Sequence, residues 1–439
     1  MKRKENKAIK INLISLGCSK NLVDSEVLMG QLRAANIEVL YEQPFDKAET
    51  IVINTCGFIQ DAKQESIDTI LRAVDAKEEG YIKKIYVMGC LSERYKEDLK
   101  TEIPEVDGFF GVKDLSLILR TLGAEYHKEL LGERMITTPS HSAYLKIAEG
   151  CDRKCAFCAI PLIRGENISR PIEELVAEAN YLASIGVKEI NLIAQDLTYY
   201  GLDLYRERRL AELLQKLSEV NGIEWIRLHY TYPAGFPLEI LDVMLANPKI
   251  CKYIDIPFQH INNDLLKSMR RNITGEETKE LMQNLRSRVP GLALRTAFIV
   301  GFPGETVEAF EELKTFITMA RFDRAGVFTY SQEEGTKAAE LTDDVPEEVK
   351  LQRADELMAI QEKISAELNQ EKVGKKYKVL FDRVEGDYFI GRTEIDSPEI
   401  DNEVLVLKTE PGIKVGEFAT ILITSSESFD LFGIPVIKN

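Results

Sequence analysis

The first third of the chain alternates between short apolar runs and longer segments with helical spacing. The apolar runs 11–17, 50–54 and 85–89 have the length and composition of buried strands. Segments with apolar residues every three or four positions lie at about 21–35, 60–79, 93–100 and 114–122. Strands that alternate with helices in this way predict a parallel sheet with covering helices.

A second and longer alternating series follows a polar stretch, 134–142, that Pro139 interrupts and that reads as a linker. Strands are predicted at 143–148, 189–194, 225–230, 253–257, 294–300 and 326–330. Helices are predicted at about 172–185, 210–220, 238–246, 276–289 and 307–320. Six strand–helix units predict a partial TIM-like (β/α)6 barrel, in which the working residues lie at the carboxyl ends of the strands.

The pattern changes twice more toward the end of the chain. Charged residues surround an apolar stripe at 346–373, which predicts a connecting helix. After Gly374 the period becomes two, in runs at 376–383, 388–393, 403–407, 418–424 and 431–437, which predicts a small β-barrel. The sequence therefore predicts an α/β protein in four parts: an N-terminal α/β domain (1–134), the partial barrel (135–345), the connecting helix (346–373) and the C-terminal β-barrel (374–439).

Composition narrows the class of protein. Of the 439 residues 44% are hydrophobic, and no apolar run approaches the roughly 20 residues that span a bilayer. The basic stretch 1–10 precedes an apolar run that is too short for a targeting segment and is interrupted by Asn12 and Ser15. We therefore expect a cytoplasmic protein without a membrane partner, whose seven cysteines serve metal or redox chemistry rather than disulfides.

Three cysteines, Cys151, Cys155 and Cys158, follow the first predicted strand of the partial barrel. Gly150 and the polar residues between the thiols give this segment turn character, so the sulfurs can point to a common centre. A structural zinc site needs four ligands, and no second cysteine pair follows. Three thiolates fit a cubane iron–sulfur cluster with one iron left open.

Three further cysteines, Cys18, Cys56 and Cys90, each follow one predicted strand of the N-terminal domain. Ligands of open parallel sheets lie beyond the carboxyl ends of the strands, so these thiols are expected to meet at one edge. The alternative is three separately buried thiols, which are common in protein cores. Equivalent positions on three strands favour a shared metal site.

The spacing of Cys151, Cys155 and Cys158 after the first strand of a partial barrel resembles the radical S-adenosylmethionine superfamily. This resemblance implies that the open iron binds S-adenosylmethionine, which the reduced cluster cleaves to methionine and a 5′-deoxyadenosyl radical. From about 10 to 438 the chain is similar to the methylthiotransferases, which add a three-cysteine N-terminal domain and a C-terminal TRAM barrel. The resemblance implies a second 4Fe–4S cluster that presents the sulfur to be transferred, with the ligands Cys18, Cys56 and Cys90.

Four segments indicate the branch of this family, because they resemble the ribosomal-protein branch. They are Leu-Gly-Cys-Ser-Lys-Asn-Leu-Val-Asp-Ser-Glu at 16–26, Glu-Gly-Cys-Asp-Arg-Lys-Cys-Ala-Phe-Cys-Ala-Ile-Pro at 149–161, Gln-Asp-Leu-Thr-Tyr-Tyr-Gly at 195–201 and His-Tyr-Thr-Tyr-Pro at 229–233. The resemblance implies that a methylthio group is added at the β-carbon of an aspartate in small-subunit ribosomal protein S-twelve. The alternatives are a tRNA adenosine methylthiotransferase and a non-catalytic iron–sulfur binding protein.

The charge of the chain bears on this choice of substrate. The chain has 56 basic and 72 acidic residues, and residues 375–439 hold 8 basic and 12 acidic side chains. A barrel that grips tRNA should present a basic face, because phosphate neutralisation dominates such affinity. An acidic barrel suits a basic ribosomal protein, so tRNA is the weaker expectation. An electron donor is implied as a further partner.

Other residues at the predicted mouth of the barrel are candidates for cofactor contacts. Gln195, Gln259 and Arg271 are candidates for binding S-adenosylmethionine or the substrate, and Phe157 for packing near the adenosyl group. The alternative roles are local hydrogen bonding and, for Phe157, shielding of the cluster. No catalytic residue is assigned beyond the six cluster ligands, and Cys251 is expected to be structural.

Overall fold

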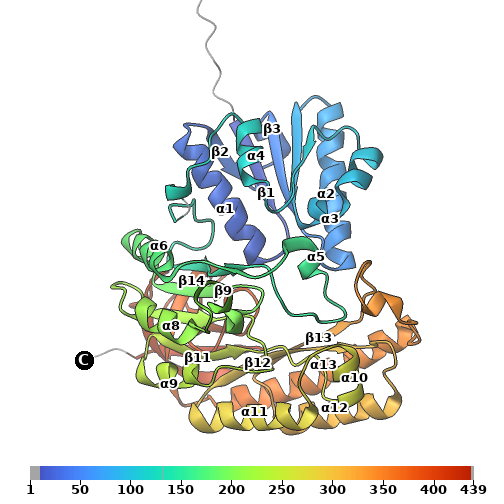
Figure 1. The fold of residues 1–439 in the computed structure, drawn as a ribbon. Helices are drawn as coiled ribbons and strands as arrows, with labels where there is room; N and C mark the ends of the chain where they lie inside the picture. The colour runs from blue at the N-terminus through green and yellow to red at the C-terminus, as the bar shows by residue number, and fades with distance from the viewer. Residues whose placement is uncertain (1–9, 131, 437–439) are drawn as a thin grey trace, which may run out of the picture.

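The computed structural model describes residues 10–130 and 132–436, in which an α/β domain, a curved parallel sheet and a β-barrel follow one another (Figure 1). The predicted α/β fold class is confirmed. The predicted N-terminal strands are confirmed as β1 (Lys10–Ser15), β3 (Thr50–Thr55) and β4 (Lys84–Gly89). They form the centre of a sheet with the order β2-β1-β3-β4-β5, whose edge strands β2 (Glu38–Tyr41) and β5 (Gly108–Phe109) are too short for a periodic signal.

Helices cover both faces of this first sheet, because its central strands are apolar on both sides. Ile51 and Ile53 of β3 pack with α2 (Gln60–Glu78) and α3 (Cys90–Glu102). Val52 points the other way and packs with α1 (Ser19–Ala34) and α4 (Leu115–Thr121). All pairings within the sheet are parallel, so every strand presents its carboxyl end at the same edge.

The second sheet has six parallel strands in sequential order, which confirms the predicted partial barrel. They are β6 (Ser142–Lys146), β9 (Glu189–Ile193), β10 (Trp225–Leu228), β11 (Ile250–Asp255), β12 (Ala293–Val300) and β13 (Arg324–Thr329). The longer helices of this part are α6 (Ile172–Ser184), α8 (Leu210–Ser218), α9 (Glu239–Ala246), α11 (Gly275–Arg288) and α12 (Val307–Ala320). Of these, α11 and α12 lie on the side away from the N-terminal domain, whereas α6 lies next to that domain (Figure 1).

Short elements after the strands were not predicted. They are the two-residue strands β7 (Ala148–Glu149) and β8 (Ile168–Ser169) and the helices α5 (Ile160–Arg164), α7 (Leu202–Tyr205) and α10 (Asn263–Ser268). Such elements are too short to show a period in the sequence. Of these, α5 lies between the N-terminal domain and the second sheet (Figure 1) and packs against α3.

The stretch 134–142 is not the solvated linker that its polarity suggested. Arg134 is buried and forms ion pairs with Glu26, at 2.8 Å, and with Glu178. Glu26 belongs to α1 and Glu178 to α6, so Arg134 fastens the N-terminal domain to the barrel. The polar side chains of this stretch therefore serve a buried interface.

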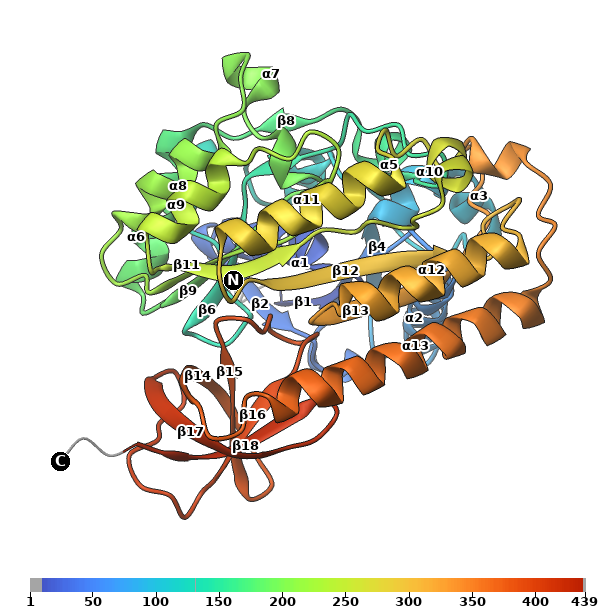
Figure 2. The same ribbon diagram turned by 90° about the horizontal axis from the view of Figure 1, so that it is seen from below.

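The C-terminal part begins with the predicted connecting helix, α13 (Glu347–Gln370), which runs along β13 and α12 (Figure 2). A closed barrel of five strands follows, as predicted: β14 (Lys376–Glu385), β15 (Tyr388–Thr393), β16 (Glu403–Leu407), β17 (Phe418–Ser426) and β18 (Asp430–Pro435). The end of the predicted run 431–437 lies outside the described residues. The domain limits at 134, 345 and 373 stay a prediction.

The loop between β15 and β16, residues 394–402, reaches from the C-terminal barrel into the second sheet. Asp396 pairs with Arg324 at 2.5 Å, Ser397 lies 3.3 Å from the His229 ring nitrogen, and Asp401 accepts a hydrogen bond from Tyr253 at 2.8 Å. These polar contacts join the small barrel to three strands or strand ends of the larger one. In the described part of the chain, no helix is long and apolar enough to cross a membrane.

Candidate active site

The three N-terminal thiols lie at the carboxyl edge of the first sheet. Cys56 directly follows β3, Cys90 is the first residue of α3, and Cys18 precedes the first residue of α1. Cys56 and Cys90 are buried, whereas Cys18 is exposed. Gly17 has a φ of +88°, and a Cβ there would lie 2.6 Å from the Cβ of Cys56, so glycine permits the close approach of these loops.

The three thiols influence one another's pKa. The pKa of Cys90 is raised to about 12, mainly by burial and in part by Cys18 and Cys56, while Arg164 opposes the rise. Burial likewise raises the pKa of Cys56, with a further contribution from Cys18. Buried thiols remain protonated unless a cation compensates the thiolate charge, and the irons of a cluster provide such compensation.

The triplet Cys151, Cys155 and Cys158 occupies the loop between β7 and α5. The pKa values of Cys151 and Cys158 are raised to about 12, mainly by burial and in part by the neighbouring thiols of the triplet. Two backbone hydrogen bonds fix the loop: Ala156 N donates to Met269 O at 2.9 Å, and Ala338 N donates to Ala156 O at 2.8 Å. The thiols are therefore grouped on a loop that its surroundings hold in place.

The predicted cofactor residue Arg271 lies against this triplet. Its Nη1 donates to the Cys155 sulfur at 3.2 Å and its Nη2 to Pro257 O at 2.6 Å. Tyr232 fixes the arginine from the other side, because its hydroxyl donates to Arg271 O at 2.8 Å and its ring lies 4.3 Å from the guanidinium. Burial works against the charge of Arg271, but the Cys155 sulfur and Tyr232 leave its pKa raised.

The other three residues predicted to contact the cofactor or substrate are Gln195, Gln259 and Phe157. They lie at the carboxyl ends of the barrel strands but differ in their surroundings. Gln195 follows β9 and donates to Glu149 at 2.7 Å, while its Oε1 is buried without a partner among the described residues. Gln259 has a φ of +74° and pairs through its backbone with β12. Phe157 packs against a small apolar cluster that contains Met269 and Phe302. Their cofactor roles stay a prediction.

Each thiol group supplies three cysteine sulfurs, which are the ligand type and number that suit a cubane with one iron left open. Arg271 beside Cys155 further suits a site that carries thiolate charge.

Arg164 is a residue that the sequence did not reveal as part of the site. It ends α5 and donates to Asn21 at 2.5 Å, to Glu149 at 2.8 Å and to the Cys90 sulfur at 3.5 Å. Asp24 accepts a further bond from it at 3.1 Å. Arg164 thus joins the N-terminal thiols to the barrel. The only sequence signal is a charged residue at the end of an otherwise apolar segment.

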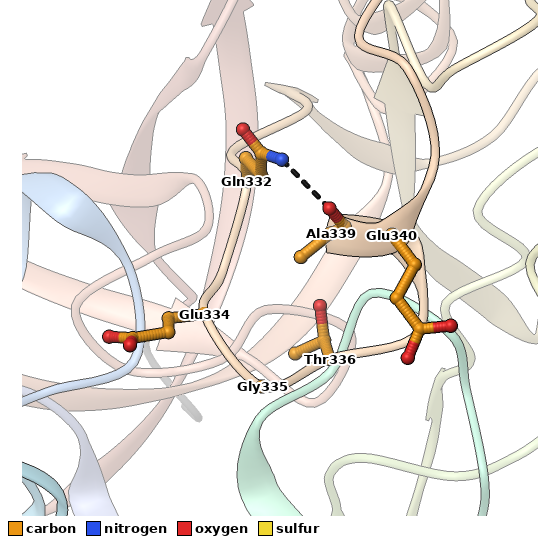
Figure 3. Close-up of a pocket in the computed structure, with 6 residues that line it drawn as sticks. All are labelled: Gln332, Glu334, Gly335, Thr336, Ala339 and Glu340. Carbon is orange, nitrogen blue, oxygen red and sulfur yellow. Dashed lines mark hydrogen bonds between the residues drawn. The ribbon is translucent and has the colours of Figure 1, made fainter.

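A loop beside the triplet also contacts the N-terminal domain. Glu333 is buried and pairs with Arg94 at 2.9 Å and with Lys63 at 2.7 Å. The loop folds around a cavity of about 500 Å³ lined by Gln332, Glu334, Gly335, Thr336, Ala339 and Glu340 (Figure 3). Gln332 donates to Ala339 O at 3.0 Å across this cavity, so the cavity belongs to the loop itself rather than to the thiol sites.

Comparisons with known proteins follow the same three-part division. Residues 10–111 match the description "Uncharacterized protein family UPF0004", residues 145–317 the radical SAM superfamily and residues 373–436 the TRAM domain. The radical S-adenosylmethionine methyltransferase TsrM from Kitasatospora setae is 13% identical, with a TM-score of 0.55 over 73% of each chain. At this identity the likeness shows a shared fold.

Curated relatives are much closer in sequence. The ribosomal protein uS12 methylthiotransferase RimO of Cytophaga hutchinsonii is 57% identical over 433 residues, which is 99% of each chain. The protein of the same name from Flavobacterium johnsoniae is 58% identical over 436 residues, 99% of this chain and 100% of the relative. Identity of this extent over the whole length shows that the chain belongs to the ribosomal protein uS12 methylthiotransferase family.

Proposed function

We propose that this protein is a radical S-adenosylmethionine methylthiotransferase that modifies ribosomal protein uS12, the S-twelve protein of the small subunit, at the β-carbon of an aspartate. The observation that carries this proposal is the presence of two groups of three thiols on either side of one domain boundary. Arg164, six residues after Cys158, reaches across that boundary to the Cys90 sulfur. A transfer reaction needs both sites close to one substrate.

We assign a 4Fe–4S cluster to each thiol group. Cys151, Cys155 and Cys158 would hold the cluster that binds S-adenosylmethionine, and Cys18, Cys56 and Cys90 would hold the second. When bound, these groups supply radical cleavage of S-adenosylmethionine, removal of a hydrogen atom from the substrate carbon and the methylthio sulfur that this carbon receives. A radical route is needed because the β C–H bond is too weakly acidic for a side-chain base.

The residues around the triplet have supporting roles in this assignment. Arg271 offers fixed positive charge beside Cys155, and Phe157 with its apolar neighbours keeps water from that side. The unpartnered Oε1 of Gln195 is an acceptor that suits the ammonium group of S-adenosylmethionine. Gln259 lies beyond the end of β11, two strands away from β9, and backbone strain accompanies its φ of +74°.

The charge of the C-terminal barrel favours a protein substrate over tRNA. Lys378, in the lysine-rich start of β14, pairs with Glu224 at 2.6 Å and lies 3.9 Å above the Phe418 ring. This lysine therefore takes part in the contact with the larger barrel. The 12 acidic against 8 basic residues at 375–439 also suit a basic ribosomal protein. The reaction would take place in the cytoplasm and use an external electron donor.

The proposal is tested by mass spectrometry of uS12 and of tRNA nucleosides from cells with and without the gene. We expect the methylthio group on uS12 to disappear on deletion and to return with the wild-type gene. A Cys155→Ala gene is the matched control and should not restore it. Loss of a methylthio group from tRNA with uS12 unchanged would contradict the proposed substrate.

A further inference from the structure

Lys20 is a mostly buried residue whose ammonium group pairs with no carboxylate among the described residues. It lies in the first turn of α1, two residues after Cys18, and its residue exposure is only 8%. Its Nζ lies 2.9 Å from the centroid of the Tyr230 ring. In the part of the chain that the structure describes, Lys20 forms no hydrogen bond and no ion pair.

The buried lysines of the described chain differ in their partners. Lys350 pairs with Asp343 and Glu347, each at 2.7 Å, and Lys372 donates to the Asn369 side-chain oxygen at 3.0 Å. The face of the Tyr230 ring attracts the ammonium group of Lys20 but does not satisfy its three N–H donors. These donors are therefore available to an anion.

The ring beneath Lys20 is held in place by a strained backbone. Tyr230 follows β10 and has a φ of +60°, which is unfavourable for an aromatic residue. Its N–H donates to the Asp255 carboxylate at 3.1 Å, and its carbonyl accepts from Leu197 N–H at 3.0 Å. These bonds keep the Tyr230 ring against the helix of the other domain, so Lys20 is directed to the carboxyl end of the barrel strands.

We propose that the Lys20 ammonium group binds the side-chain carboxylate of the substrate aspartate, an inference that rests on the proposed function. Lys20 lies in the helical turn that follows Cys18, one of the N-terminal thiols. Its ammonium group contacts Tyr230, which follows strand β10 of the larger barrel. A carboxylate bound there lies at the boundary between the two sites, with its β-carbon one bond farther on. Lys20 is therefore a specificity residue that selects an acidic side chain over its amide.

The test is a double-mutant cycle that combines a change of Lys20 with a change of the target aspartate. It measures the dissociation constant of uS12 under conditions without turnover. The full-length, cluster-loaded protein without reductant is titrated with uS12 and with a uS12 variant in which asparagine replaces the target aspartate. We expect Lys20→Met to weaken binding of normal uS12 roughly 30-fold, the equivalent of about 2 kcal/mol. Wild-type and Lys20→Met proteins should bind the asparagine variant equally, and Lys20→Arg should keep most of the affinity.

Controls separate this inference from other effects. Lys47→Met removes one charge at an exposed site paired with Asp46 and should leave binding unchanged. Iron content checks that Lys20→Met keeps its clusters; if iron is lost, the cycle is repeated with Lys20→Gln. Independent, additive losses from the lysine and aspartate changes would overturn the assignment of Lys20. Failure of the reduced wild-type protein to add a methylthio group to uS12 would instead overturn the proposed function.

Discussion

Arg164 joins two domains through buried charges, and its removal should loosen their contact. With a side chain only 2% exposed, it neutralises Asp24 and Glu149 together with Lys146. Arg164→Met leaves two carboxylates with one cation, and breaking a buried pair in this way costs about 3–5 kcal/mol. We expect a lower thermal unfolding midpoint and faster amide exchange in α1 and α5. Arg209→Met, which removes an exposed pair with Glu207 and Glu212, should leave the midpoint unchanged.

Glu149 gives this contact a dependence on pH. Burial opposes its ionisation, but Lys146 and Arg164 overcome that effect and hold its pKa well below the ordinary 4.5. As the pH falls below 4.5, the Glu149 carboxylate binds a proton in the unfolded chain before it does so in the folded protein. The stabilisation that Glu149 provides is complete at neutral pH and is lost progressively as the pH falls. Thermal midpoints measured from pH 7 downward should fall, and Glu149→Gln should flatten this part of the profile.

The assignment of six cysteines predicts a specific iron content. Two cubanes give about eight irons per chain after anaerobic reconstitution, and Cys90→Ala should reduce the number toward about four. Cys251→Ala is the matched control, because Cys251 is buried in β11 among Trp225, Tyr253 and Leu380 and touches neither thiol group. An unchanged iron content in Cys90→Ala, measured with iron and sulfide assays, would contradict the second cluster.

Sequence and structure differ most at residues whose partners are distant along the chain. The six cysteines could be singled out because their spacing and their positions after strands are visible in the sequence. Lys20 contacts Tyr230, 210 residues away, and Arg164 contacts Asn21, 143 residues away, so no local pattern reveals either. Their roles depend on how two domains dock, which periodicity does not report.

At the scale of elements, one buried carboxylate on β9 joins two barrels. Glu189 pairs with Arg227 of β10 at 3.0 Å and with Arg392 of β15 at 2.7 Å, and all three side chains are almost completely buried. Asp382 of β14 pairs with the same Arg392 at 2.6 Å. Because one glutamate faces two guanidinium groups, it stabilises the β9–β10 pairing and the attachment of the C-terminal barrel together.

Glu189→Gln should therefore destabilise the protein strongly. The amide leaves two buried guanidinium groups short of one negative charge, a loss of about 3–5 kcal/mol. We expect denaturant unfolding to begin at a lower urea concentration, with the C-terminal barrel released first. Glu417→Gln, which removes the exposed partner of Lys188, should unfold like the wild-type protein.

The elements themselves were predicted with uneven success, for a physical reason. Long helices such as α11 and α12 and the buried strands of both sheets carry strong periodic signals, and the structure confirms them. The short elements α5 and α7 form only because tertiary contacts hold them, so their sequences show no period. Of the two, α5 belongs to the site, because its last residue Arg164 reaches the Cys90 sulfur.

At the scale of the whole molecule, charge should govern the encounter with uS12. The chain carries a net charge of −16, and a basic partner is steered toward such a surface over a range set by salt. We expect the association rate constant, measured by stopped flow, to fall steeply between about 50 and 500 mM salt while the dissociation rate changes little. A rate independent of salt would contradict the proposed role of the acidic charge.

The loop 394–402 has a consequence for how the protein is made. In this loop Asp396 pairs with Arg324 and Asp401 pairs with Arg295. Both arginines precede their partners by more than seventy residues, so they leave the ribosome well before the loop does. During synthesis Arg324 therefore lacks its carboxylate partner, and Arg295 pairs with Asp255 alone, until the last part of the chain appears. Vectorial folding can finish the N-terminal domain early, but the barrel completes late. Nascent chains that stop before residue 394 should thus engage chaperones and remain sensitive to protease.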